Sequence, residues 1–94
     1  MDFKVISNNG ILVRGREVFD VYTVALSNGE KIPVEIKSGS NGRLPEMDDI
    51  IKSVSYRADS DWQEEFENFP GFINYKAAKA YYKDLKEVLL AAVS

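Results

Sequence analysis

Cysteine and histidine are both absent from the 94 residues of this chain. Without cysteine there are no disulfides, no thiolate nucleophiles and no cysteine-ligated zinc or iron–sulfur centres. Without histidine, serine–histidine–aspartate catalysis and imidazole acid–base chemistry near neutral pH are excluded. The catalytic chemistry that stays open uses carboxylates, lysines, tyrosines and hydroxyls, as in magnesium-assisted phosphoryl transfer or hydrolysis by a carboxylate pair.

Long apolar runs are also missing, since none approaches the roughly 20 residues of a membrane-spanning helix. The first ten residues include Asp2 and Asn8-Asn9 where a secretion signal would have an apolar stretch. We therefore expect a cytoplasmic protein that does not enter the membrane. With 45% hydrophobic and 29% charged residues the chain has the composition of a globular domain, and its length predicts one domain over residues 1–94.

Strand signals dominate the first 37 residues. Turn-forming residues separate β-rich runs over 3–6, 11–14, 17–26 and 31–37. Asn28-Gly29, between the last two runs, is a strong hairpin signal. The sequence therefore predicts an N-terminal antiparallel meander of about four strands, and the alternation over 51–57 favours a fifth.

A two-residue loop at Asn28-Gly29 would set the register of that hairpin, because it would place Ala25 opposite Ile32 and Val21 opposite Ile36. The face that this register turns to the core consists of Phe19, Val21, Ala25, Ile32, Val34 and Ile36. The opposite, solvated face then consists of Asp20, Tyr22, Val24, Leu26, Lys31, Pro33, Glu35 and Lys37.

Helical spacing appears in the second half of the chain. Trp62, Phe66 and Phe69 fall on one stripe, and residues 74–93 carry apolar side chains at helical intervals. A short helical turn over 46–49 precedes them. The fold class is therefore α+β, with two or three helices packed on one face of the sheet.

One motif carries catalytic chemistry: Asp20 is followed across the hairpin by Glu35-Ile36-Lys37. This pattern resembles the PD-(D/E)xK nuclease core, and the run 34–38 is similar to its VRR-NUC type. The resemblance implies a metal site of Asp20 and Glu35 holding Mg²⁺, with Lys37 as the third catalytic residue. Phe19 stands where that family has a proline. The structural alternative is a hairpin face whose opposite charges pair in solvent.

Charge is segregated along the chain, which has a net charge of −3. Residues 46–67 hold eight acidic side chains against two basic ones. Around Trp62, this segment offers a candidate partner-binding surface of Asp59, Asp61, Trp62, Glu64, Glu65 and Glu67. Such a surface suits a basic partner by charge complementarity, although acidic residues near a helix N-terminus also simply favour the helix dipole.

A lysine row offers the opposite charge on the 74–93 helix. Its members are Lys76, Lys79, Lys83 and Lys86. The spacing places them on one stripe that could follow nucleic-acid phosphates, and it is equally the solvated face of an amphipathic helix. Tyr22 and Tyr56 could add base stacking to such a role.

We therefore expect a small acidic, non-enzymatic interaction protein of the inhibitor or adaptor type, without a cofactor. Its partner would be a larger basic or nucleic-acid-handling protein, and a phage or plasmid origin fits its size. The alternative is the Mg²⁺-dependent nuclease, and the third hypothesis is a single-strand nucleic-acid binder. A homodimer is left open.

Overall fold

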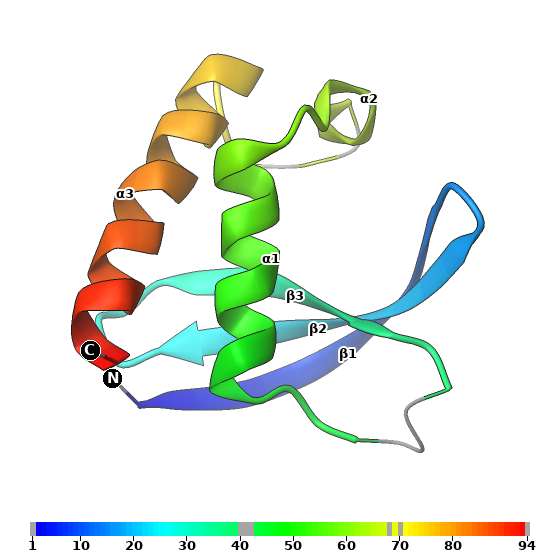
Figure 1. Cartoon of the computed structure of the whole chain (residues 1–94), viewed down its shortest axis with the longest axis horizontal. Coiled ribbons are helices and arrows are strands. Elements are labelled where there is room, and N and C mark those ends of the chain that lie inside the picture. The colour runs from blue at the N-terminus through cyan, green and yellow to red at the C-terminus, as the bar shows by residue number, and fades with distance from the viewer. Residues whose placement is uncertain (1, 40–42, 68, 70, 94) are drawn as a thin grey trace. The chain divides into compact units, whose positions relative to one another are not determined.

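The computed structural model describes residues 2–39, 43–67, 69 and 71–93. The chain forms two compact units, Met1–Ser53 and Val54–Ser94. The first contains an antiparallel sheet in the order β1-β2-β3, made of β1 (Phe3–Arg14), β2 (Glu17–Leu26) and β3 (Lys31–Lys37). The helices that follow are α1 (Met47–Asp59), α2 (Gln63–Phe66) and α3 (Tyr75–Val93) (Figure 1). The α+β class is confirmed.

The described sheet has three strands where the sequence predicted about four. Asn8-Asn9-Gly10 does not reverse the chain but forms a bulge inside the 12-residue strand β1. Gly10 has a φ of 105°, and its N–H donates to the Asn8 side chain at 2.9 Å. The Asn9 side chain also hydrogen-bonds to Thr23 on β2. Local side-chain bonds therefore absorb the extra residue, and the strand continues.

The turn between β2 and β3 is one residue longer than predicted. The Leu26 N–H donates to the Glu30 carbonyl at 2.8 Å, so Ser27, Asn28 and Gly29 form the loop, with Gly29 at a φ of 92°. This is the three-residue hairpin in which a glycine takes the left-handed position. Val24 therefore pairs with Ile32, where the sequence predicted Ala25.

That single residue changes which side of β2 is buried. Ile32, Val34 and Ile36 of β3 are buried as predicted, but the β2 residues beside them are Tyr22, Val24 and Leu26. The predicted core residues Phe19, Val21 and Ala25 are only half-buried. A shift of one residue moves every side chain of a strand to the other face.

The fifth strand predicted over 51–57 is wrong, because these residues belong to α1. Ile50, Val54 and Ala58 are fully buried at four-residue intervals, which is the period of a helix. The helix begins after Glu46, whose carbonyl accepts from the Ile50 N–H at 3.1 Å and whose own N–H donates to Asp49 at 2.8 Å. The Asp49 side chain thus satisfies the N–H that precedes the helix, as the acidic residue of a capping box does, and this favours a helix over the alternating pattern of valine, tyrosine and alanine.

Within the first unit, α1 also covers the open edge of β3. The backbone N–H of Glu35 donates to the Ser53 hydroxyl at 3.0 Å, in a buried hydrogen bond. An edge strand has unpaired backbone groups, and a buried one must find a partner. Ser53 supplies that partner.

The long helix of the second unit agrees closely with its predicted range of 74–93. The Asn74 side chain accepts from the Ala77 N–H at 2.8 Å and so caps the helix start. Ala78, Tyr82, Leu85 and Leu89 form its buried stripe, whereas Ala92, which the helical spacing predicted on the same face, is exposed.

Candidate functional site

The nuclease-like residues do not share one face of the hairpin. Asp20 pairs with Ile36, whereas Glu35 pairs with Val21 and Lys37 with Phe19. Directly opposed residues share a face and successive residues alternate, so Asp20 lies on one face while Glu35 and Lys37 lie on the other. The metal-site hypothesis needed both carboxylates together, and the observed register removes that geometry. No cluster of three or more metal-ligating carboxylates occurs among the described residues.

Glu35 makes an ion pair inside the first unit. Its side chain is buried, and its Oε1 accepts from Arg14 Nη2 at 3.1 Å. The Arg14 guanidinium also lies 5.2 Å from the centre of the Phe19 ring. Strands β1, β2 and β3 each contribute one of these residues, so the ion pair connects the two edges of the sheet across its middle strand.

Tyr22 and Tyr56 each have a structural role within their own unit. Tyr22 is buried on the same face as Val24. The Tyr56 hydroxyl donates to Glu65 at 3.0 Å. Tyr22 therefore does not lie on an open surface for base stacking, which corrects the prediction that placed it on the solvated face.

Trp62 is a core residue of the second unit, with only 2% of its surface exposed. Its ring lies edge-to-face against Phe66, Phe69, Tyr75 and Tyr82, at centroid distances between 5.2 and 6.1 Å. Its Nε1–H donates to the Arg57 carbonyl at 2.8 Å, and its backbone N–H donates to the Tyr75 hydroxyl at 3.0 Å. The prediction that Trp62 contacts a partner at the surface is corrected: it anchors the segment from within.

Arg57 lies among these aromatic rings. Its guanidinium carbon is 4.7 Å from the centres of both Trp62 and Phe69, and 6.0 Å from that of Tyr82. The residue is buried, and a desolvated cation over aromatic faces is stabilised by their negative quadrupole. We call Arg57, Trp62, Phe69 and Tyr82 the Arg57 cluster.

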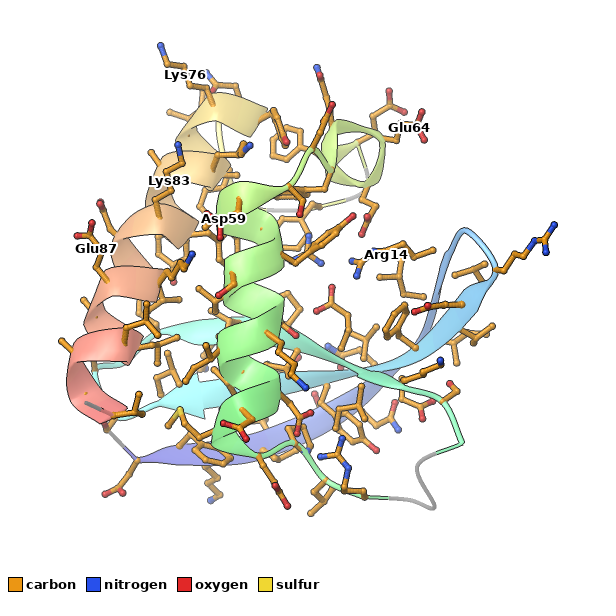
Figure 2. The ribbon with its side chains drawn as sticks, in the orientation of Figure 1. Arg14, Asp59, Glu64, Lys76, Lys83 and Glu87 are labelled. Atoms are coloured by element: carbon orange, nitrogen blue, oxygen red, sulfur yellow. The ribbon has the colours of Figure 1, made fainter. Side chains whose placement is uncertain are left out.

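Some acidic residues around the Arg57 cluster have charged or hydrogen-bonding partners, and others extend into solvent. Asp59 forms an ion pair with Lys86, and Glu65 accepts from Tyr56. Asp61, Glu64 and Glu67 are exposed, and Glu64 extends outward from α2 in Figure 2. Asp61 also accepts from the Gln63 N–H at 3.2 Å and from the Tyr75 hydroxyl at 3.4 Å, so its position is set by α2 and α3 together.

The lysine row on α3 likewise contains both engaged and exposed side chains. Lys86 pairs with Asp59, and Lys79 Nζ lies 5.7 Å from the Tyr75 ring centre. Lys76 and Lys83 are exposed, and Figure 2 shows both extending from α3, Lys76 near the start of the helix and Lys83 closer to Glu87. Two of the four predicted phosphate contacts are therefore engaged within the second unit.

An electrostatic contact also lies at the start of α1. Arg43 Nη1 and Nη2 donate to the two carboxylate oxygens of Asp49, at 2.6 and 3.1 Å. These hydrogen bonds lower the pKa of Asp49, and the Glu46 N–H contributes in the same direction. Asp49 belongs to the acidic block by sequence, yet its charge is balanced locally.

Sequence reasoning missed Arg14 and Arg57. Arg57 carried one usable signal, its position relative to buried residues of the same helix. Once 47–59 is a helix, Arg57 follows Val54 by three residues and precedes Ala58 by one, so it lies on the buried side together with Ser53. Arg14 gave no local signal, because its partner lies two strands away.

Comparison of the chain with family models, with curated proteins and with solved structures finds no match. Among the described residues, no helix has the length and hydropathy needed to cross a membrane.

Proposed function

We propose that this chain is a non-enzymatic interaction protein of the inhibitor or adaptor type, which binds a basic surface of a larger protein through Asp61, Glu64 and Glu67. We call these three residues the α2 acidic surface. The observation that supports this proposal is the exposure of three carboxylates over seven residues of chain whose backbone is anchored by a buried tryptophan.

The anchoring matters because it lowers the entropy lost on binding. The Trp62 N–H and the Asp61 carboxylate both contact the Tyr75 hydroxyl, and the Trp62 indole bonds to Arg57. The backbone that carries these carboxylates, and the Asp61 carboxylate itself, are therefore held in place before a partner arrives. Preorganised surfaces bind more tightly than flexible ones of equal charge.

Charge supports a basic partner of this kind. Residues 46–67 hold eight acidic side chains, and among them Asp61, Glu64 and Glu67 are exposed and follow one another closely around Trp62. Complementary charges accelerate association and make the affinity depend on salt. A protein that binds nucleic acid offers basic patches of the required sign.

The experiment uses an arginine-rich peptide as the basic probe and a single-stranded DNA oligonucleotide as the competing probe. We expect the wild-type chain to bind the peptide, with an affinity that falls as salt rises. The double change Glu64→Lys and Glu67→Lys should weaken this binding by about tenfold or more and flatten the salt dependence. Stability should change by only about 0–1 kcal/mol, because both residues are exposed.

The matched control reverses two exposed residues of the lysine row, Lys76→Glu and Lys83→Glu, and should leave peptide binding intact. The proposal fails if the glutamate reversal leaves peptide binding unchanged. If the lysine reversal instead abolishes binding to the oligonucleotide, the lysine row is the functional surface and the nucleic-acid hypothesis takes precedence.

A further inference from the structure

The outer edge of β1 presents apolar side chains to solvent. β1 is an edge strand, because β2 is the only strand beside it in the part of the chain that the structure describes. Ile11 and Val13 are 68% and 61% exposed, and Val18 on β2 is 39% exposed. Val13 pairs with Val18, and Ile11 lies two residues before Val13, so all three share one face of the hairpin.

The longest regularly paired stretch of this edge is its last four residues. The register of β1 is irregular between Val5 and Ser7 and again between Asn8 and Ile11, and it is regular from Ile11 to Arg14. Figure 1 shows this half of the hairpin as a curved ribbon that ends in the turn after Arg14. Bulges hinder the addition of another strand, so Ile11–Arg14 is the part of the edge suited to it.

The backbone groups of Ile11 and Val13 point outward from the sheet. The Ser38 N–H donates to the Val18 carbonyl at 2.8 Å, so the backbone groups of Val18 face β3. In an antiparallel pair, the opposed residue then directs its own N–H and C=O away from its neighbour. Val13 opposes Val18, and Ile11 has the same parity, so both residues offer an N–H and a C=O at the open edge.

We propose that two copies of this chain associate through this edge, with their β1 strands antiparallel about a two-fold axis at Leu12. This register places Ile11 of each copy opposite Val13 of the other. Both pairs are of the hydrogen-bonded kind, so four backbone hydrogen bonds form across the axis. On the apolar face, Val18 and Val13 of one copy form a continuous apolar row with Ile11 of the second copy.

Charge and space favour this register over one with its axis at Asn9. Arg14 comes to lie opposite Gly10 of the second copy, where a side chain is absent and an added Cβ would meet nothing within 4 Å. An axis at Asn9 would instead place Lys4 opposite Arg14 and would run through both bulges. Like charges directly opposed across strands are destabilising. The edge is therefore self-complementary about Leu12, as a two-fold dimer requires.

The expected dimer is weak. Four backbone hydrogen bonds and three exposed apolar side chains from each copy are a small contact beside the about 800 Å² per partner of a stable interface. Association should therefore depend on concentration, and it is measured by sedimentation equilibrium up to about 1 mM protein. This proposal is independent of the α2 acidic surface, which lies in the other unit.

Charge placed on the edge tests the apolar contact. Ile11→Lys and Val13→Lys should each remove the dimer, because the dimer would bring two new ammonium groups, one from each copy, into the contact. Both positions are exposed, so far-UV circular dichroism should be unchanged. The matched control is Val88→Lys, which changes a valine of 45% exposure on α3 and should dimerise as the wild type does.

A disulfide tests the register, since the chain has no cysteine of its own. Leu12 meets its own copy at the axis in a non-hydrogen-bonded pair, where Cα atoms are about 4.5 Å apart and a disulfide can form. Leu12→Cys should therefore form a covalent dimer on mild oxidation. Val18→Cys should not, because the β2 strands of the two copies, which carry this residue, would lie three strand spacings apart, about 14 Å.

A wild-type chain that stays monomeric at every concentration overturns the proposal. So does a Val13→Lys variant that dimerises as well as the wild type. Equal cross-linking by Leu12→Cys and Val18→Cys rules out this register and overturns the proposal as stated.

Discussion

Met1–Ser53 and Val54–Ser94 bury different kinds of side chain. The first unit buries mainly aliphatic residues, together with Tyr22, on a sheet and leaves one strand edge exposed, with Glu35 as its buried charge. The second unit buries a cation, Arg57, among aromatic rings, and its long helix has a regular apolar stripe. One small chain therefore combines the backbone pairing of a sheet with aromatic packing around a cation. We expect these two arrangements to respond differently to substitution.

The largest effect is expected at the centre of the second unit. Trp62→Ala removes four ring contacts and the hydrogen bond to the Arg57 carbonyl. We expect a loss of about 3–5 kcal/mol in the free energy of unfolding, as for other buried tryptophans. Urea unfolding followed by circular dichroism measures it. A loss below about 1 kcal/mol would mean that the Arg57 cluster does not stabilise this unit.

The second effect separates the cation from the aromatic rings. Arg57→Lys keeps the charge but loses the planar guanidinium that lies over Trp62 and Phe69. We expect a destabilisation of about 1–3 kcal/mol, measured by the same unfolding experiment. The exposed Lys83→Arg change serves as the control and should fall within about 0.5 kcal/mol of the wild type. A variant as stable as the wild type would show that charge alone is sufficient.

The third effect tests the register of the first unit. Val24 is fully buried and Val21 is half-buried, whereas the register predicted from sequence reverses their roles. Val24→Ala should cost about 2 kcal/mol, because it removes two buried methyl groups, and Val21→Ala should cost clearly less. The reverse order in thermal unfolding would favour the two-residue loop at Asn28-Gly29.

The smallest effect concerns pH. The Arg43 hydrogen bonds lower the pKa of Asp49 in the folded chain below its unfolded value of about 3.9. A depressed carboxyl pKa adds stability above the unfolded pKa, and this stability is lost as the pH falls through the folded pKa. Asp49→Asn should therefore lower the melting temperature slightly at pH 7, and the difference should shrink as the pH falls below the unfolded pKa of about 3.9. A difference that stays constant with pH would assign the effect to capping rather than charge.

Local patterns predicted the second unit better than the first. The apolar spacing of α3 depends on contacts within one helix, so its range and buried stripe followed from residues 74–93 alone. Trp62, Phe66 and Phe69 were expected to lie together, and they do, although α2 ends at Phe66. The exposure of Trp62 was misjudged because only packing decides which side of an aromatic stripe meets solvent.

In the first unit, the number of residues in the turn between β2 and β3 decided which face of β2 is buried, and the sequence left that number open. Both two-residue and three-residue hairpins accept Asn28-Gly29, and the difference changes the buried face of β2. That shift also separated Asp20 from Glu35 and removed the geometry of the nuclease-like motif. Likewise, the alternation over 51–57 fits a strand locally, but Ile50, Val54 and Ala58 are buried at helical spacing.

The sequence by itself determined the α+β class, the long C-terminal helix, the buried side of β3 and the chemistry excluded by the absence of cysteine and histidine. These follow from composition and from periodicities carried by neighbouring residues. Tertiary structure alone decided the register of β2, the pairing of Arg14 with Glu35 and the burial of Arg57 and Trp62. Those features depend on residues far apart in the chain, and their free energy is realised only when packing removes water from between them.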